Sequence, residues 1–422
     1  MRKGALLFLI GCCAVSFSVF AQSSSVSPYS RFGPGDLLFN GFAHQRAMGG
    51  TGLAQANTSR LNISNPATLC YDTLMVFEFG LLSESLYLKQ DELETRKLNA
   101  RIDYLVVGLP VVRNKMGMAF GFIPFSGAGY SIRSSAPVDS LNTLTTTYEG
   151  TGGYNRYFIS TGLKLAKNLS FGATVSYLFG AGEQNRNFRF SDNNFMGTRV
   201  RDNTVINDFL FDFGLHWRTL LKDNLSLSLG LAGSMERNLK ANRTLLWENF
   251  RPNVFGTPIS KDTILYREKE SGRVTMPFSW SFGAQLAKAD NWLLQADVRF
   301  QQWSRYESFN DDDSLKNSMR IGCGGQYIDD PKGTRFIQRI QFRAGFYYSL
   351  SYLNIRDTHV ADNGITIGAG LPLRKAFQSM INIALEAGQR GTLENDLIRE
   401  RYFRIVLGLT FNEHWFQKKR YE

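Results

Sequence analysis

Hydrophobic and polar side chains alternate along most of this chain with a period of two residues. From Leu169 to Gly180 the odd positions are apolar, whereas the even positions are mostly small or polar. The same alternation recurs in 208–218, 225–232 and 403–411. Such alternation places apolar side chains on one face of a β-strand and polar side chains on the other.

The lengths of these segments favour a membrane barrel over a soluble fold. A tilted membrane-spanning strand needs about 9–11 residues, whereas strands of soluble domains average about 5–6. Most of the alternating segments reach the spanning length. In a transmembrane barrel the apolar face meets lipid and the polar face lines the lumen. The alternative is a periplasmic or surface array of β-sandwiches.

Fourteen such segments can be counted between residues 73 and 412. Short turns, such as those at 113–115 and 222–224, alternate with longer connections at 135–150, 189–201, 246–271 and 306–313. An even number of antiparallel strands brings both chain ends to the periplasmic side. The sequence therefore predicts an all-β fold, a 14-stranded antiparallel transmembrane β-barrel over residues 73–412.

The N-terminal residues have the features of a secretory signal peptide. Arg2 and Lys3 precede an apolar or small stretch over 4–20, and Val19 and Ala21 suit a small-residue cleavage site. A competing interpretation is a lipoprotein signal ending at Cys12, but an apolar stretch follows that cysteine where a lipoprotein turns polar. We expect residues 1–21 to be removed and the protein to reach the bacterial outer membrane.

Residues 22–72 do not alternate, and they contain two short motifs. A glycine-rich run from Arg46 to Ala54 leads to Asn65-Pro66-Ala67. The lumen of a fourteen-stranded barrel is wide enough to accept such a segment. We therefore predict that residues 22–72 form a plug, or hatch, inside the barrel. Its motif residues are Arg46, Met48, Gly49, Gly50, Gly52, Asn65, Pro66 and Ala67.

This combination resembles the FadL-type family of outer-membrane transporters, which includes FadL and TodX. Members pair fourteen strands with an N-terminal hatch whose glycine-rich segment leads to an Asn-Pro-Ala motif. The sequence looks most like the Bacteroidota branch, which also contains barrels similar to PorV of the type IX secretion system. The resemblance implies a channel for passive uptake of hydrophobic or amphipathic small molecules.

Charge and its placement limit the other possibilities. The chain has 48 Lys and Arg against 37 Asp and Glu, a formal charge of +11. The basic residues are dispersed and the chain is exported, so we expect no nucleic-acid partner. A charge facing lipid at the midplane costs about 2–4 kcal/mol, so charged residues on the strands should face inward. The predicted lumen residues are Asp208, Asp212, His216, Arg218, Asp297, Arg299, Arg320, Arg339, Arg343, Glu386 and Arg404.

The last ten residues, 413–422, form a predicted periplasmic tail. Trp415 and Phe416 suit the inner aromatic girdle of the membrane, with Lys418, Lys419 and Arg420 touching lipid phosphates. The alternative is that the tail docks a periplasmic partner through an aromatic anchor and a charged rim.

No catalytic, metal or cofactor site is indicated. The four His are scattered without the spacing of metal ligands, and the glycine-rich run lacks the Lys-Ser/Thr of a phosphate-binding loop. Cys70 and Cys323 lie in different contexts, which favours two free thiols over a disulfide. We expect no enzyme and no cofactor.

The polar face of the strands leaves the function open between two alternatives. A channel for hydrophobic molecules needs an apolar pocket with few polar groups, yet the predicted lumen carries many charges. The alternative is a non-transporting accessory barrel subunit of an outer-membrane secretion (type IX) or barrel-assembly complex. The expected partners are outer-membrane lipid and lipopolysaccharide, with a hydrophobic substrate in the first case and other complex subunits in the second.

Overall fold

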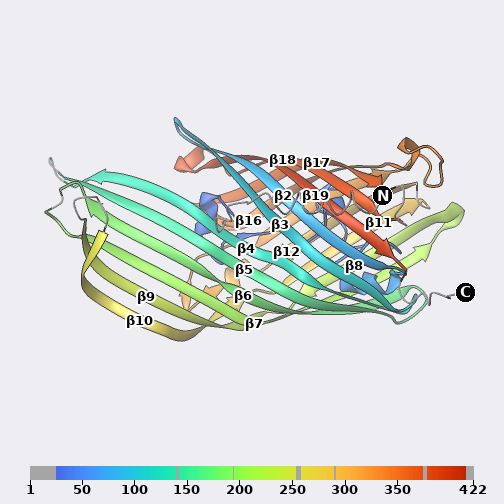
Figure 1. Cartoon of the computed structure of the whole chain (residues 1–422), viewed down its shortest axis with the longest axis horizontal. Coiled ribbons are helices and arrows are strands. Elements are labelled where there is room, and N and C mark those ends of the chain that lie inside the picture. The colour runs from blue at the N-terminus through green and yellow to red at the C-terminus, as the bar shows by residue number, and fades with distance from the viewer. Residues whose placement is uncertain are drawn as a thin grey trace, which may run out of the picture.

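A computed structural model of the chain describes residues 25–138, 142–192, 194–252, 258–288, 291–373 and 378–414. Its antiparallel strands form a closed barrel (Figure 1), because the last strand, β19 (Arg399–Glu413), pairs with the first wall strand, β2 (Met75–Gln90). No helix within the described ranges is long and apolar enough to cross a membrane. The predicted signal peptide and the tail residues Trp415, Phe416, Lys418, Lys419 and Arg420 lie outside these ranges.

Fourteen strands make up the wall among the described residues, which confirms the predicted 14-stranded antiparallel barrel. Between β2 and β19 they follow one another in chain order, apart from two interruptions described below. They are β3 (Leu93–Val112), β4 (Met116–Pro137), β5 (Thr143–Lys164), β6 (Leu169–Phe190), β7 (Gly197–Leu220), β8 (Leu225–Ser234), β11 (Ser279–Lys288), β12 (Trp292–Gln301), β15 (Ser318–Tyr327), β16 (Gln341–Ile355), β17 (Thr358–Pro372) and β18 (Met380–Arg390).

The long connections contain more strand than the sequence predicted. Region 246–271 was expected to be a loop, but its described residues belong to β9 (Arg237–Pro252) and β10 (Pro258–Met276). These two strands prolong β8 and β11 toward the left-hand end of Figure 1, the upper end of the barrel. The register of β9 against β7 continues the sheet beyond the end of β8. There both faces can be polar, so the period-two pattern no longer marks the strand, although its backbone hydrogen bonds persist.

The connection after β12 folds inward instead of projecting outward. It contains the short helix η4 (Trp303–Arg305) and the short strands β13 (Glu307–Ser308) and β14 (Asp311–Asp312). Strand β13 pairs with the end of β10, so this connection covers the inner side of the upper barrel.

The two faces of the wall differ as the alternation predicted. Tyr177, Phe342 and Leu407 are 37%, 50% and 48% exposed on the outer surface. Their sequence neighbours Ser176, Arg343 and Val406 are buried on the inner side. An apolar outer surface of this kind is stable when lipid covers it.

The wall opens between β3 and β4. The two strands pair only from Leu105 to Val112 and from Met116 to Phe122. Above this level residues 93–104 of β3 pair with β2 alone, and the β2–β3 hairpin separates from β4 (Figure 1). On the other side of the opening, β1 (Asp36–Leu37) pairs with β4 at Ser126 and Gly127.

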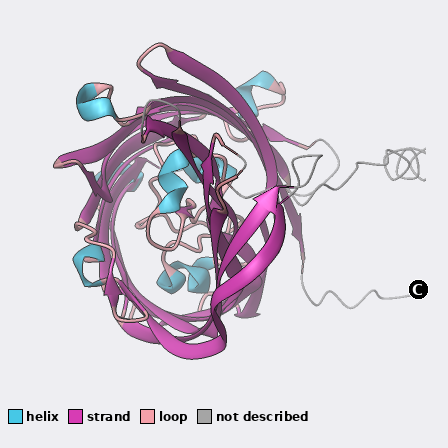
Figure 2. Cartoon of the chain, turned by 90° about the vertical axis from the view of Figure 1, so that its left-hand side faces the viewer, coloured by secondary structure: helices cyan, strands magenta, loops and turns pink. Residues whose placement is uncertain are grey.

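The described part of the predicted plug, residues 25–72, lies inside this wall, as the end-on view shows (Figure 2). It contains η1 (Pro28–Arg31), β1, α2 (Ala43–Arg46) and η2 (Pro66–Tyr71). Its lower part packs on the wall through a hydrophobic cluster that includes Phe42, Leu61 and Leu69 from the plug and Tyr104 and Val106 from β3. Burying these side chains is the main gain from placing the plug in the lumen.

Candidate functional site in the barrel interior

The glycine-rich run holds the plug against the wall through its backbone. The amide of Gly49 donates to Oγ1 of Thr366 on β17 at 2.8 Å. Gly49 has φ +71, and a Cβ there would lie 2.4 Å from the carbonyl oxygen of Phe346. Glycine is needed at this position for both reasons, because other residues rarely adopt positive φ and none could approach so closely. Gly50, with φ +76, continues the same bend.

The end of the run is fixed by one carboxylate. Asp297 Oδ2, on β12, accepts hydrogen bonds from the amides of Gly52 at 2.6 Å and Leu53 at 3.0 Å. Met48, fully buried, contacts the side-chain amide of Gln295 on the same strand. Charge-assisted hydrogen bonds are stronger than neutral ones, so Asp297 is a main anchor of the plug.

The Asn65-Pro66-Ala67 motif forms the start of η2. The Oδ1 atom of Asn65 accepts the amide of Ala67 at 3.1 Å, which caps the helix. Its Nδ2 donates to the carbonyl of Leu53 at 2.9 Å and to that of Leu215, on β7, at 3.0 Å. One side chain therefore joins the two plug motifs to each other and to the wall.

Glycines on the inner face of the wall make room for the plug, and the sequence analysis did not single them out. A Cβ on any of them would lie 2.0–2.5 Å from an atom of the plug. In the sequence these glycines occur at the inward-facing positions of the period-two pattern, in place of polar residues. They are Gly117, Gly162, Gly172, Gly214, Gly230, Gly324 and Gly345.

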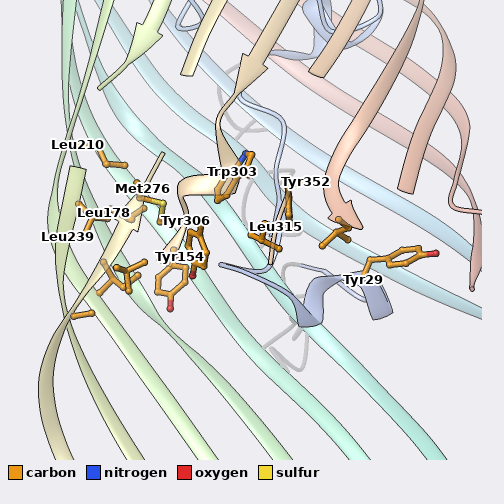
Figure 3. Packing of buried hydrophobic residues seen from close by; sticks show 14 of the residues in the cluster. Tyr29, Tyr154, Leu178, Leu210, Leu239, Met276, Trp303, Tyr306, Leu315 and Tyr352 are labelled. Atoms are coloured by element: carbon orange, nitrogen blue, oxygen red, sulfur yellow. The ribbon is translucent and has the colours of Figure 1, made fainter. Parts of the chain in front are cut away.

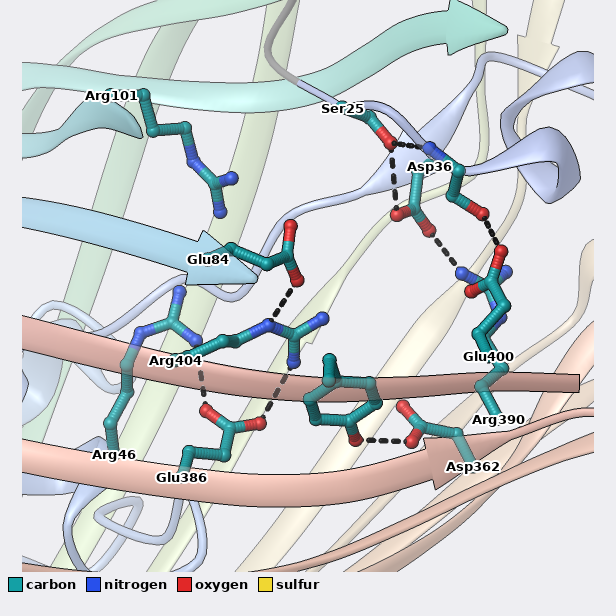
Figure 4. A network of polar contacts seen from close by, with 12 residues as sticks. Ser25, Asp36, Arg46, Glu84, Arg101, Asp362, Glu386, Arg390, Glu400 and Arg404 are labelled. Atoms are coloured by element: carbon teal, nitrogen blue, oxygen red, sulfur yellow. Dashed lines mark hydrogen bonds and ion pairs between the residues drawn. The ribbon is translucent and has the colours of Figure 1, made fainter. Parts of the chain in front are cut away.

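Arg46 links the plug to two wall strands by ion pairs. Its Nε lies 3.2 Å from Asp103 on β3, and its Nη1 lies 3.6 Å from Glu386 on β18. Glu386 also pairs with Arg404 at 2.8 Å, and Arg404 pairs with Glu84 at 2.5 Å (Figure 4). Burial of Arg46, Asp103 and Glu386 makes these pairs costly to break.

A second ion network holds the upper part of the plug. Arg390 Nη1 lies 2.7 Å from Asp36, and Ser27 Oγ donates to Glu400 at 2.5 Å (Figure 4). The sequence analysis missed Asp36, Arg390 and Glu400, since Asp36 lies in the predicted plug, outside the predicted strands, and the other two lie at strand ends. Their pairing depends on how far the plug reaches up the lumen, which periodicity does not encode.

The other predicted lumen residues occupy several separate environments. Asp208 Oδ2 accepts the amide of Lys240 at 2.9 Å, and Asp212 lies 3.6 Å from Arg156. His216 Nε2 lies 3.1 Å from the carbonyl oxygen of Ala54 in the plug.

Arg343 and Arg218 also lie on wall strands. Arg343 donates to Gln326 at 2.9 Å and to Asn382 at 2.8 Å, so it joins neighbouring strands within the wall. Arg218 is half-buried on β7, two positions beyond His216 on the same face.

Arg339 departs from the prediction that it lines the lumen on a strand. It lies in the short helix η5 (Ile337–Arg339), in the connection between β15 and β16. The strand begins only at Gln341, because residues 329–340 form turns stabilised by bonds such as that from the amide of Asp330 to the carbonyl of Gln338.

Two titratable groups of the plug are deeply buried. Burial lowers the pKa of His44 well below its usual value, and the nearby Arg343 and Arg60 lower it further. Burial, with the charge of Glu78, raises the pKa of Asp72 well above its usual value. Cys70 and Cys323 are both free thiols.

A cavity of about 310 Å³ lies between the plug and the wall, and most of the side chains that line it are charged or polar. Seven arginines and five carboxylates face it, among them Arg156, Arg299, Arg320, Asp212 and Glu386.

The largest apolar cluster of the interior is filled by the protein's own side chains. Trp303, Tyr306 and Leu315 pack against wall residues such as Tyr154 and Met276 (Figure 3). One cavity is thus lined by five of the predicted lumen residues, Asp212, Arg299, Arg320, Glu386 and Arg404, while the apolar cluster is closed by packing.

Comparison of the whole chain with protein families gives one clear result. A family model described as BamG matches residues 1–422. The chain belongs to the BamG family. No curated protein matches the sequence of this BamG-family chain.

The BamG-family barrel shares its fold with solved structures of FadL-type transporters. A Pseudomonas aeruginosa FadL homologue aligns with a TM-score of 0.62 at 13% identity, covering 90% of this chain and 100% of that chain. The Pseudomonas putida toluene transporter TodX aligns with a TM-score of 0.59 at 16% identity, covering 90% of this chain and 100% of that chain. The Ralstonia pickettii toluene transporter TbuX aligns with a TM-score of 0.57 at 16% identity, covering 89% of this chain and 99% of that chain.

At these identities the likeness concerns the fold, and it agrees with the FadL-type architecture expected from the plug motifs. Assignment of the BamG-family barrel to a Bacteroidota branch with PorV-like members stays a prediction.

Proposed function

We propose that this chain is a plugged outer-membrane barrel that acts as a non-transporting subunit of an outer-membrane protein complex. The observation that carries this proposal is the interior: the cavity is lined by seven arginines and five carboxylates, and the apolar cluster above it is packed with side chains. An apolar molecule placed in that cavity would displace water from charged groups without replacing its hydrogen bonds, which is unfavourable.

The way in which the plug is held supports the same function. It is tied to the wall by the Arg46 ion pairs, the Asp297 and Asn65 hydrogen bonds and the Asp36–Arg390 pair. These contacts involve strands on several sides of the barrel. Moving the plug would break many of them at once, so we expect the lumen to stay closed at equilibrium.

The opening between β3 and β4 supplies a surface for a membrane partner. Among the described residues, no strand pairs with residues 93–104 of β3 on the side away from β2, and Leu98 and Ile102 on its outer face are 71% and 50% exposed. A strand edge of this kind is a template for pairing with another chain, and a partner strand that covers it would continue the sheet there. A place among other complex subunits is otherwise suggested only by the family name, BamG.

The outer membrane is the proposed location because the wall combines an apolar outer face with a polar inner face. The signal peptide over 1–21 and the periplasmic tail over 413–422 are part of this proposal. In the tail, Trp415 and Phe416 either complete the inner aromatic girdle or dock a periplasmic partner.

The test is purification of the tagged full-length protein from its native outer membrane in a mild detergent, followed by size-exclusion chromatography. We expect it to elute with defined partners in constant stoichiometry, and reciprocal tagging of a partner should recover the same complex. In planar bilayers the purified protein should conduct little current. Elution as a lone barrel that conducts freely would contradict the proposal.

The second candidate function is passage of hydrophobic or amphipathic small molecules. The specific observation in its favour is the opening between β3 and β4, which leads from the cavity-lining Arg101 and Phe125 toward the lipid. A strain lacking the protein would then take up toluene or a fatty acid more slowly, and the protein would bind such a molecule in detergent. Unchanged uptake together with a stable complex would favour the subunit.

A further inference from the structure

Arg299 and Arg320 are direct partners on neighbouring strands of the wall. Arg299 on β12 stands opposite Arg320 on β15 in the register of the sheet. Both side chains line the cavity of about 310 Å³. Like charges directly opposite each other destabilise a sheet, so this pair requires an explanation.

Other charged rows of the interior alternate in sign. Glu386 stands opposite Arg404, and Arg404 stands opposite Glu84. Likewise Asp362 stands opposite Arg390, and Arg390 stands opposite Glu400. The Arg299–Arg320 pair departs from this rule, since its outer neighbours in the sheet are Ser281 and Ser349.

Neither of the two arginines has an ion-pair partner among the described residues. Arg299 Nε donates to Ser281 Oγ at 3.3 Å, and Arg320 Nη2 donates to the carbonyl of Gly49 at 3.4 Å. The guanidinium of Arg320 also lies 3.7 Å from the centre of the Tyr347 ring. These contacts orient both groups without neutralising them.

The nearby carboxylates each have a partner. Asp297, two positions from Arg299 on the same face, accepts the plug amides of Gly52 and Leu53 with its Oδ2, while its Oδ1 has no hydrogen-bond partner among the described residues. Asp362, which lies near Arg320, accepts the hydroxyl of Tyr402. Asp212 pairs with Arg156 at 3.6 Å and accepts the hydroxyl of Ser234. Glu386 is held between Arg46 and Arg404.

Arg156, on β5, is a third arginine of this cavity. It is 9% exposed, yet its Nε atom has no hydrogen-bond partner among the described residues. A buried donor left without an acceptor is unfavourable. The lining as a whole has two more positive than negative groups, from seven arginines and five carboxylates.

We propose that Arg299, Arg320 and Arg156 form a binding site for an oxyanion, a phosphate, sulfate or carboxylate group, in the cavity between plug and wall. Guanidinium groups match the planar and tetrahedral oxygens of such anions with paired hydrogen bonds. The ligand is hydrophilic at this end, because the surrounding lining is polar. The same chemistry is offered by free phosphate and by the phosphorylated headgroup of a lipid that reaches the cavity through the opening between β3 and β4. This site is independent of whether the barrel belongs to a complex.

The experiment uses full-length protein purified in a mild detergent, with heat-modified gel migration as the check on folding. The melting temperature is measured in sodium phosphate and in sodium chloride at equal ionic strength. We expect phosphate to raise the melting temperature of the wild type in a saturable way. Arg299→Gln and Arg320→Gln should weaken phosphate binding by roughly tenfold or more, because each removes a charge-assisted hydrogen bond.

A matched control variant and the melting temperature in chloride separate anion binding from a purely structural role of these arginines. Arg356→Gln removes an exposed arginine and should leave the phosphate effect unchanged. In chloride alone, Arg320→Gln should melt close to the wild type, since relief of the repulsion from Arg299 offsets the lost contacts with Gly49 and Tyr347. A structural role would instead lower the melting temperature equally in both salts.

A second set of measurements with lipid vesicles distinguishes a free anion from a phosphorylated lipid headgroup. Vesicles containing lipopolysaccharide are compared with vesicles containing the same lipid after dephosphorylation. If only inorganic phosphate raises the melting temperature, the site binds a free anion. If only the phosphorylated lipid raises it and Arg299→Gln abolishes the effect, the site binds a lipid headgroup. The absence of a phosphate-specific effect in both arms, or its persistence in Arg299→Gln and Arg320→Gln, would overturn the proposal. Should either variant fail to fold, equilibrium dialysis measures phosphate binding to the wild type directly, and the absence of binding would overturn the proposal.

Discussion

The Nη1 atom of Arg46 lies 3.6 Å from Oε2 of Glu386, which joins helix α2 of the plug to strand β18 of the wall. The same guanidinium pairs with Asp103 on β3 at 3.2 Å. Replacing Arg46 with Gln would remove one of two arginines from each carboxylate, since Glu386 keeps Arg404 at 2.8 Å and Asp103 keeps Arg101 at 3.7 Å. We expect a loss of about 1.5–3 kcal/mol in the free energy of unfolding, measured by urea titration, and a higher single-channel conductance as the plug loosens.

Arg356→Gln is the matched control, since it removes an arginine of an exposed pair with Asp396. Exposed pairs contribute about 0–1 kcal/mol, so stability and conductance should stay close to the wild type. Equal effects of the two substitutions would mean that the plug does not depend on Arg46.

Gly172 allows the plug backbone to touch the wall. A Cβ at this position would lie 2.3 Å from the carbonyl carbon of Pro66, which is backbone and cannot rotate away. Gly172→Ala should therefore displace η2 and destabilise the protein by about 1–3 kcal/mol, the usual cost of overpacking. Limited proteolysis of the plug in detergent would report the displacement.

Gly182, on the same strand, provides the comparison. A Cβ there meets nothing closer than the hydroxyl oxygen of Tyr154 at 3.4 Å, an ordinary contact. We expect Gly182→Ala to leave proteolysis unchanged. Protection of the plug in both variants would show that close approach at Gly172 is not required.

The outer face of β19 should tolerate charge only away from the midplane. Leu407 is 48% exposed on the middle of this strand. Leu407→Arg should cost about 2–4 kcal/mol in a bilayer, whereas Leu93→Arg, at the tip of the β2–β3 hairpin, should cost about 0–1 kcal/mol. Folding titrations into lipid vesicles measure both values, and a larger loss at Leu93 would place the membrane band elsewhere.

Acid should loosen the plug through His44. This side chain is 1% exposed, and in the part of the chain that the structure describes its Nδ1 has no hydrogen-bond partner. Because burial and the nearby Arg343 and Arg60 lower its pKa in the folded protein, the unfolded chain binds the proton more readily. Stability is therefore complete above the ordinary His pKa and falls by up to about 1.4 kcal/mol for each pH unit below about 6.5.

His44→Gln should remove this part of the pH dependence, so the difference between wild type and variant is the quantity to measure. Asp72 acts in the opposite direction, because its raised pKa favours the folded state at low pH and that contribution is lost as pH rises above about 3.9. Parallel pH profiles for wild type and His44→Gln would contradict the role of His44.

Alternation along the chain determined the strands, their inward and outward faces and their number. The reason is that every strand of the wall has one face toward lipid and one toward the lumen. Leu407 and Tyr177 therefore face outward regardless of which strands flank their own. The plug was predictable as a break in this pattern, and its two motifs do contact the wall. The part of the β9–β10 hairpin within 246–271 escaped prediction, because backbone pairing stabilises these strands without leaving a period-two pattern in the sequence.

Only the tertiary structure decided which interior residues meet. The partners of Arg46 are Asp103 and Glu386, which are 57 and 340 positions away in the chain. Their proximity depends on the closure of β19 onto β2 and on the depth of the plug in the lumen. The same register sets Arg299 opposite Arg320, although the sequence pattern predicts each of them only as a charge that faces the lumen. Periodicity assigns a side chain to a face, whereas the register between strands, set by all the hydrogen bonds of the closed wall together, assigns its neighbours.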